Sequence, residues 1–193
     1  MFIDVAIPSG DEKEFIQASK KLGTSGIIFV YEKDDRNNLE EVKKLNSKNF
    51  KVLTAIVGKM SSKYDYAFSM GERKDFENKK TDVIFNLEKN SGRDKPHYRS
   101  SGLNQVLCKL AKEKNILIAL NFNSVLKAKD RELMMGRMAQ NIKICKKYKV
   151  ELLIASFAKK PSELRYWSDL ISFGIVLGLN SKQAKKAVLN RKV

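Results

Sequence analysis

The chain has 193 residues, of which 42% are hydrophobic and 31% are charged. Its 38 Lys and Arg residues outnumber its 22 Asp and Glu residues, so the formal net charge is +16 at pH 7. The hydrophobic fraction is too high for a disordered tail, and the lack of any run of about 18 apolar residues argues against a membrane span.

Seven short apolar segments predict β-strands. Ile27–Val30 and Ile116–Leu120 are continuously apolar instead of alternating with polar residues. This pattern is typical of strands buried on both faces, as in a parallel sheet covered by helices. In chain order, the predicted strands are Phe2–Ile7, Gly26–Tyr31, Lys51–Val57, Tyr66–Met70, Asp82–Asn86, Ile116–Leu120 and Glu151–Ala155.

Charged segments with helical periodicity separate most of these strands. The first helix is predicted to begin at a capping box, with Ser9 as the N-cap and Glu12 three positions later. In the longest helix, Arg131–Tyr148, apolar residues such as Met138 share one side, and Arg137 is predicted to point away from it. The other predicted helices are Asn38–Leu45, Leu103–Glu113, Leu170–Leu177 and Ser181–Leu189.

Repeated strand–helix units with short links predict right-handed crossovers and a parallel α/β sheet. Seven strands fit either an open doubly wound sheet or a compact, irregular TIM-like (β/α) barrel of about seven mostly parallel strands. We favour the barrel, because the units follow one another without a topological switch point. No linker rich in Pro, Gly or Ser divides the sequence, so we expect a single domain over residues 1–193.

The N-terminus and the cysteines suggest a cellular compartment. Asp4 interrupts the first apolar segment before the core of a signal peptide could form. The two cysteines, Cys108 and Cys145, suit buried thiols in a reducing compartment better than a disulfide framework. We therefore expect a cytoplasmic protein without a membrane partner.

Several enzyme classes lack the residues they need. His97 is the single histidine, so a multi-histidine metal site is excluded, and its cationic neighbours make it a poor general base. Gly58 and Lys59 suggest a phosphate-binding loop, but Leu53 and Met60 stand where that motif needs Gly and Ser or Thr.

Carboxylates offer the one alternative chemistry. Asp4 lies in the first predicted strand, and Glu32, Asp34 and Asp35 follow the second. In a barrel, these positions would approach the carboxyl rim, where catalytic groups gather. A metal-dependent phosphoesterase that holds magnesium with these acids is therefore the second hypothesis, although Asp34 and Asp35 also suit a solvated turn.

The excess of basic residues is the stronger signal. Lys127–Lys149 and Ser181–Val193 are rich in Lys and Arg, and Lys89–Arg99 combines basic residues with a tyrosine and a histidine. Cationic side chains that neutralise phosphates release counterions, so this charge favours a polyanionic partner. Arginine beside an aromatic residue also suits phosphate contact and base stacking. The candidates in Lys89–Arg99 are Arg93, Lys95, His97 and Arg99.

Four consecutive segments of the second half resemble the archaeal ribonuclease P protein component 3 family, whose eukaryotic counterpart is a nuclear ribonuclease P subunit. Ser101–Leu107 resembles a helix start in that family, and Ile116–Leu126 a strand leading to a turn. Arg131–Tyr148 resembles its long helix ending in Lys-Lys-Tyr, and Ile154–Gly174 its most recognisable stretch. The resemblance extends over about residues 82–190.

The resemblance implies an irregular TIM-like barrel, related to metal-dependent phosphoesterases but without their histidine ligands. It implies a protein subunit of ribonuclease P, the endoribonuclease that removes the 5′ leader from precursor tRNA. In that enzyme the RNA and its bound magnesium carry the chemistry. The chain would bind no cofactor or metal, contact the ribonuclease P RNA, and reach precursor tRNA indirectly. It would pair with protein component 2 in a two-plus-two heterotetramer.

The resemblance also implies RNA contact at particular positions. Gln105 and Ser168 depart from the family, whose members often carry histidine and arginine there, and Lys159 and Lys160 could replace the lost arginine. Basic positions of the family match Arg99, Lys114, Arg131, Lys147, Arg165 and Lys185. With the residues suggested by charge, the candidate RNA-binding set is Arg93, Lys95, His97, Arg99, Lys114, Arg131, Lys147, Lys160, Arg165 and Lys185. No residue is assigned a catalytic or metal-binding role.

Overall fold

The computed structural model describes residues 2–34, 36–58, 61–77, 80–89 and 92–189. Seven parallel strands form one sheet in which each strand pairs with its neighbours in sequence. The prediction of the strands is confirmed to within one residue at each end. They are β1 (Ile3–Ala6), β2 (Gly26–Tyr31), β3 (Lys51–Val57), β4 (Tyr66–Ser69), β5 (Val83–Phe85), β6 (Leu117–Asn121) and β7 (Leu152–Ala155).

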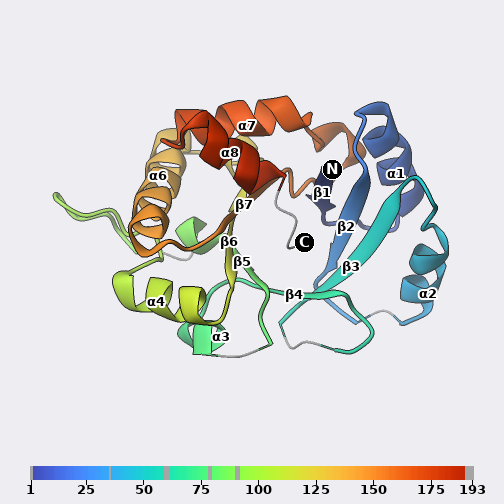
Figure 1. The fold of residues 1–193 in the computed structure, drawn as a ribbon, viewed down its shortest axis with the longest axis horizontal. Coiled ribbons are helices and arrows are strands. Elements are labelled where there is room, and N and C mark those ends of the chain that lie inside the picture. Colours follow the sequence, from blue (N-terminus) through green and yellow to red (C-terminus); the bar gives the residue numbers. More distant parts are fainter. Residues whose placement is uncertain (1, 35, 59–60, 78–79, 90–91, 190–193) are drawn as a thin grey trace.

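The sheet curls until its two edges meet. Beyond β7, Ala158 forms a parallel bridge with Ala6 of β1. The Ile7 N–H donates to the Ala158 carbonyl at 2.8 Å, and the Ala158 N–H donates to the Val5 carbonyl at 3.3 Å. The result is a nearly closed TIM-like barrel with helices outside it, which confirms the predicted α/β fold class. Figure 1 shows α1 (Glu12–Lys21) and α2 (Arg36–Lys44) on one side of the strands and α4 (Gln105–Glu113) and α6 (Arg131–Tyr148) on the other.

The helices follow the predicted order, with two short additions. Neither α3 nor α5 was predicted, because five residues are too few to show helical periodicity. The longer helices are α1 (Glu12–Lys21), α2 (Arg36–Lys44), α4 (Gln105–Glu113), α6 (Arg131–Tyr148), α7 (Trp167–Val176) and α8 (Ser181–Val188). The short ones are α3 (Arg73–Glu77), α5 (Phe122–Leu126) and the 3₁₀ turns η1 (Leu87–Lys89) and η2 (Pro161–Glu163).

Two predicted helix starts are wrong. The predicted capping box at Ser9 does not form, because Gly10 has a φ of +97° that no helix adopts, and α1 begins at Glu12 after Asp11. The Asp11 carboxylate instead accepts a hydrogen bond from the Ser9 N–H at 3.1 Å. Helix α7 starts at Trp167, three residues before the predicted start at Leu170.

The apolar residues form an inner and two outer layers. Val5, Ala55, Phe68 and their neighbours fill the barrel interior. The largest outer cluster packs α4, α6, α7 and α8 against β5–β7, and another packs α1 and α2 against β2 and β3. Cys108 and Cys145 are free, buried thiols of the first outer cluster, as predicted. Among the helices in the described ranges, none combines the length and hydropathy of a membrane span.

Candidate nucleic-acid interface

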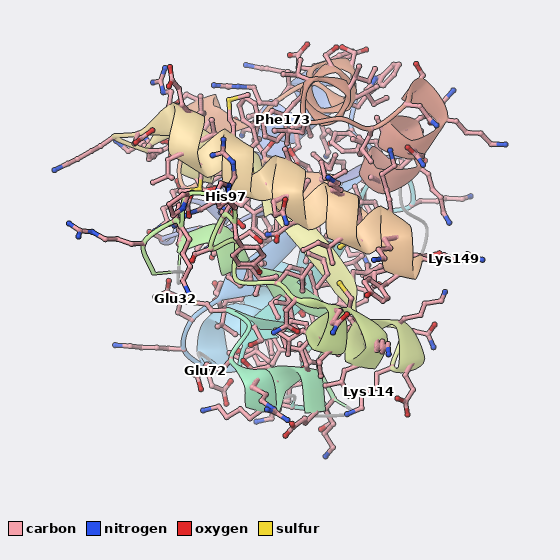
Figure 2. The ribbon with its side chains drawn as sticks, turned by 90° about the vertical axis from the view of Figure 1, so that its left-hand side faces the viewer. Glu32, Glu72, His97, Lys114, Lys149 and Phe173 are labelled. Atoms are coloured by element: carbon pink, nitrogen blue, oxygen red, sulfur yellow. The ribbon has the colours of Figure 1, made fainter. Side chains whose placement is uncertain are left out.

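The ten candidate residues divide between the two ends of α6. This helix has 18 residues and is therefore about 27 Å long. Figure 2 shows it from the side, with His97 toward one end and Lys149 at the other. The groups are named after the ends of the strands. The carboxyl-end group lies at the carboxyl rim of the strands, where α6 begins, and consists of Arg93, Lys95, His97, Arg99, Arg131, Lys160 and Arg165. The amino-end group lies at the amino rim of the strands, where α6 ends, and consists of Lys114, Lys147 and Lys185.

Four members of the carboxyl-end group lie on one connection, the 92–99 loop between η1 and α4. All four side chains are exposed. Lys95 and Tyr98 pair through backbone hydrogen bonds of 2.8 and 3.2 Å, which form a tight turn with His97 near its tip. The turn presents a histidine, a tyrosine and cationic side chains together, as the sequence predicted.

The 92–99 loop is fixed to α6 by Arg137. The Arg137 side chain is buried, with 8% of the residue exposed, so the prediction that it points away from the core is wrong. Its guanidinium donates to the Glu88 carbonyl at 3.0 Å and the Gly92 carbonyl at 2.6 Å, and Nε donates to Asp94 Oδ1 at 2.9 Å. Satisfying a buried guanidinium requires several acceptors, and this loop supplies them. Apolar periodicity alone could not reveal such a partner.

Asp94 organises the same loop from within. Desolvation opposes its charge, but the Ser100 N–H at 2.8 Å and Arg137 together lower the pKa of Asp94 below its usual value. Arg99 Nη1 lies 3.9 Å from the same carboxylate. The Arg99 guanidinium also rests on Gly136, where a Cβ would lie 2.1 Å from Nη1. Glycine at 136 therefore gives Arg99 its place on α6, with about half of the Arg99 side chain still exposed.

Glu163 fixes the second connection of the carboxyl-end group. Its carboxylate accepts the Lys159 N–H at 2.9 Å, the Asn123 amide at 3.0 Å and the Lys127 ammonium at 2.6 Å. Burial opposes this charge, but the Lys127 ammonium and the Lys159 N–H lower the pKa of Glu163. The connection thus anchored carries Lys160 and Arg165 outside the barrel, with Lys160 exposed.

Arg165 and Arg131 lie beside the two ends of α5. The Arg165 guanidinium carbon lies 5.5 Å from the Phe122 ring centroid, in a cation–π contact. Its Nη1 donates to the Leu164 carbonyl at 2.9 Å, so the head group is held but still partly exposed. Arg131 is exposed and donates to the Leu126 carbonyl at 3.4 Å. Helix α5 therefore joins Arg131 and Arg165 into one basic surface.

The amino-end group is more loosely held. Lys147 is exposed and lies 5.7 Å from the Tyr148 ring centroid, and Lys185 is exposed on α8. Lys114 is half-buried and donates to the Glu77 carbonyl. Because the length of α6 separates these residues from the carboxyl-end group, one phosphate cannot contact both groups.

The carboxylates of the alternative hypothesis do not gather. Asp4 is fully buried and accepts hydrogen bonds from the Val5 N–H, the Ser156 N–H and the Ser156 hydroxyl, at 2.8, 2.8 and 2.6 Å. Glu32 is exposed, and Asp34 accepts a hydrogen bond from the Tyr64 hydroxyl at 3.0 Å. Asp35 lies outside the described residues. Over the described ranges, no cluster of three or more His, Cys, Asp or Glu side chains could hold a metal ion.

Three aromatic rings pack on one another inside the barrel, near the carboxyl ends of β4 and β5. Phe85 ends β5 and stacks on Phe157, with centroids 5.3 Å apart and planes within 9°. Phe68 meets both rings edge-on at 6.0 and 6.2 Å. Beside them, the Asn121 amide donates to Asn86 Oδ1 at 2.9 Å. These rings pack inside the barrel, whereas a hollow of about 520 Å³ opens beside the carboxyl ends of β1 and β2, with Glu32 and Lys159 in its lining.

The two departures from the family have local partners. Gln105 begins α4, and its Oε1 accepts a hydrogen bond from the Tyr148 hydroxyl at 3.1 Å. Ser168 lies in the first turn of α7, where its hydroxyl is 3.4 Å from Asp169 Oδ1. Trp167 packs against the outer cluster and against Tyr166, whose ring centroid is 5.5 Å away.

Comparisons with known proteins show which family the sequence resembles. The sequence model of the family described as RNase P subunit p30 matches residues 94–192. Ribonuclease P protein component 3 of Methanosarcina mazei is 28% identical over 205 residues, covering 95% of this chain and 82% of its own. The component 3 protein of Methanococcus maripaludis is 26% identical, covering 81% of this chain and 78% of its own.

Solved structures show the same fold. A chain in the cryo-EM structure of archaeal ribonuclease P with mature tRNA superposes with a TM-score of 0.78 at 24% identity, covering 96% of this chain and 86% of that one. Histidinol phosphate phosphatase of Lactococcus lactis, solved with zinc, L-histidinol and phosphate, gives a TM-score of 0.64 at 9% identity, covering 95% and 93%. The barrel is thus shared with a metal-bound phosphatase, whereas the sequence similarity is to ribonuclease P proteins.

Proposed function

The chain belongs to the RNase P subunit p30 family, and from this premise we propose that it is a protein subunit of ribonuclease P that binds the enzyme's RNA through the basic residues at both ends of α6. Ribonuclease P is the endoribonuclease that removes the 5′ leader from precursor tRNA. The subunit would position the RNA by contacts to phosphates, which carry little sequence information.

The observation that carries this proposal is the carboxyl-end group. Segments far apart in the sequence contribute it, and buried side chains fix its loops: Arg137 holds the 92–99 loop, and Glu163 holds the connection that carries Lys160 and Arg165. The Lys and Arg side chains of this group carry positive charge at the surface, and the buried side chains of Arg137 and Glu163 hold the loops that carry them. Such an arrangement presents positive charge in a set geometry, which suits a partner with many phosphates.

The chemistry would belong to the RNA partner. This proposal is supported by Asp4, which is fully buried and makes its hydrogen bonds within the barrel, and by Phe68, Phe85 and Phe157, which pack on one another there. We propose that the magnesium ions required for cleavage are held by the RNA and that this chain binds no cofactor of its own.

Protein component 2 is the protein partner that we propose, in a two-plus-two heterotetramer. Helix α7 supports this proposal, because Ile175 and Val176 are 43% and 71% exposed and apolar. They lie on a helix outside the carboxyl-end group and could be covered while RNA is bound. The solved archaeal enzyme contains mature tRNA, and precursor tRNA would meet this chain indirectly, through the RNA.

The first test is the salt dependence of RNA binding. If about five phosphates are neutralised, log K should fall with log salt at a slope of roughly −3.5 to −4.5. The double variant Arg99→Ala and Arg165→Ala should weaken binding of the ribonuclease P RNA and make the slope shallower by one to two. Fluorescence anisotropy with labelled RNA, from low to high potassium chloride, measures both quantities.

The matched control is Lys13→Ala with Lys48→Ala, which removes two exposed positive charges outside both groups. The control should bind RNA nearly as tightly as the unchanged chain. A salt-independent affinity, or equal losses in the two double variants, would contradict the proposed contact surface. Circular dichroism should show that both variants remain folded, because all four replaced side chains lie outside the core.

A further inference from the structure

A surface hollow opens at the amino end of the barrel, away from the carboxyl mouth. It has a volume of about 360 Å³ and lies between the ends of α4 and α6, the start of β7, and α8. Small-molecule sites usually measure roughly 300–1,000 Å³, so the hollow is large enough for one ligand of that class. Figure 2 shows Lys149, one of its lining residues, at the end of α6 opposite His97.

The lining of the hollow is strongly basic. Lys112, Lys146, Lys149 and Lys186 line it together with a single carboxylate, Glu151. Three other surface hollows contain as many acids as bases in their linings, or more. The positive lining is therefore a property of this hollow and does not follow from the net charge of the chain alone.

Neighbouring groups neutralise only part of the positive charge of these lysines. Lys186 Nζ lies 3.0 Å from Glu151, and Lys146 Nζ donates to the Gly178 carbonyl at 3.2 Å. The C-termini of α4 and α6 each contribute about half a negative charge. Four ammonium groups less one carboxylate and two half charges leave about two positive charges. Within the described ranges, the ammonium groups of Lys112 and Lys149 have no hydrogen-bond or ion-pair partner.

The floor of the hollow is apolar. Val150, Leu152, Leu179 and Ala187 contribute to it, and each is more than nine-tenths buried. A bare phosphate would leave this floor uncovered, whereas a flat aromatic base could lie on it. Two positive charges beside an apolar surface match a nucleotide, because a nucleotide within an RNA chain is flanked by two phosphates of one negative charge each.

We propose that this hollow is a nucleotide site, which holds one unstacked nucleotide of an RNA with its base on the apolar floor and its phosphates among Lys112, Lys146, Lys149 and Lys186. Proteins commonly recognise RNA by capturing unstacked bases of single-stranded regions. The inference that the ligand is a nucleotide rests on the hollow itself. The inference that this nucleotide belongs to an RNA chain rests on the proposed function.

The test uses the full chain, two probes and three variants. The probes are 5′-AMP and the ribonuclease P RNA. Gln183→Tyr fills the hollow without changing its charge. It also removes the Oε1 that accepts the Asn180 N–H in the capping box of α8, so circular dichroism is used to check that this variant stays folded. Lys112→Gln with Lys149→Asn removes two charges, and asparagine suits the left-handed backbone at residue 149, where φ is +55°. Lys109→Gln with Lys143→Asn is the matched control, since both lysines are exposed on α4 and α6 but do not line the hollow.

Millimolar 5′-AMP should shift the NMR amide resonances of Val150 and Glu151 in the unchanged chain and in the control, but not in the two hollow variants. RNA affinity should fall at least tenfold further in the hollow variants than in the control, because Gln183→Tyr excludes the nucleotide and the lysine double variant removes two phosphate contacts. If 5′-AMP shifts these resonances but the hollow variants and the control bind RNA equally tightly, the hollow is a nucleotide site, and the inference that its nucleotide belongs to RNA is overturned. No shifts with 5′-AMP and equal RNA affinities would overturn the site.

The two proposals can fail separately. If the unchanged chain does not bind the ribonuclease P RNA at all, the proposed function fails, and the 5′-AMP titration still decides whether the hollow binds a nucleotide. If the RNA binds with the expected salt dependence but the hollow variants behave as the control does with both probes, the nucleotide site alone is overturned.

Discussion

At Asp4, burial and hydrogen bonding act against each other. Burial in the barrel wall disfavours the charged carboxylate, and three donors from Val5 and Ser156 favour it. Burial has the larger effect and raises the pKa of Asp4 to about 6. The Ser156 hydroxyl that donates to Asp4 also accepts the Arg165 N–H at 3.0 Å, so the buried acid supports a member of the carboxyl-end group.

This raised pKa predicts how stability depends on pH. Between about pH 4 and pH 6 the folded state binds more protons at Asp4 than the unfolded state, so the free energy of unfolding falls as pH rises. The rise from an ordinary value of about 3.9 to about 6 corresponds to about 3 kcal/mol. The unfolded Asp4 is already about half ionised at pH 4, so the difference in unfolding free energy between the unchanged chain and Asp4→Asn should shrink by about 2 kcal/mol from pH 4 to pH 7.

Urea denaturation at several pH values measures that difference. Subtracting the two chains removes the contribution of Glu88, whose burial raises its own pKa to about 7. A difference that stays constant from pH 4 to pH 7 would show that Asp4 has an ordinary pKa in the folded chain.

The position and exposure of a residue could be predicted from the sequence where they depend only on its neighbours in the chain. Arg93, Lys95, His97 and Arg99 share one loop because they are neighbours in the chain, and their exposure follows from their polarity. Arg137 could not be predicted in the same way. Its burial depends on acceptors at Glu88, Gly92 and Asp94, more than forty positions earlier, and helical periodicity carries no information about such contacts.

At the level of elements, the 92–99 loop depends on one side chain of α6. Replacing Arg137 by Met would keep most of its volume but remove its contacts to Glu88, Gly92 and Asp94. We expect a loss of stability on the order of 2 kcal/mol and a lower RNA affinity, although Arg137 is too buried to contact RNA itself.

Hydrogen exchange tests this prediction at a single amide. The Ser100 N–H donates to Asp94 Oδ1 at 2.8 Å and should lose protection in Arg137→Met. The control is Arg131→Met, on the exposed first turn of the same helix, whose stability should change by less than about 0.5 kcal/mol. Unchanged protection of Ser100 in Arg137→Met would mean that the loop holds its shape without Arg137.

Strands could be predicted from the sequence more reliably than helix ends. A run such as Ile116–Leu120 is apolar throughout, and only a buried strand suits it at that length. The start of α1 depended on a positive φ at Gly10, which the polar sequence around Ser9 does not specify. The start of α7 was missed because Trp167 and its polar neighbours break the apolar pattern from which Leu170 was chosen.

Across the whole molecule, the two ends of the barrel differ in character. At the carboxyl end, Phe68, Phe85 and Phe157 pack on one another inside the barrel, and a hollow of about 520 Å³ opens beside the ends of β1 and β2. The residues proposed to meet RNA lie outside the strands, on loops and helix ends. The fold is shared with a phosphatase, and we propose that here it supports surface charge that contacts RNA.

This arrangement predicts that the purified chain alone hydrolyses neither RNA nor simple phosphate esters, with or without magnesium. Release of 4-nitrophenol from its phosphate esters, and gel analysis of labelled precursor tRNA, measure the two activities. A control with Asp4→Asn guards against a contaminating nuclease. Hydrolysis that depends on magnesium and is lost in Asp4→Asn would revive the phosphoesterase hypothesis.

The closure between Ala158 and Ala6 has a consequence for biosynthesis. Asp4 and Ser156, which bond across that seam, are 152 positions apart. At a translation rate of about 5–20 residues per second, β1 emerges from the ribosome roughly 8–30 s before its last neighbour exists. Contacts so distant along the chain are slow to form. During that interval one edge of the nascent first strand would remain unpaired. A ribosome-associated chaperone would have its greatest effect on this unpaired edge.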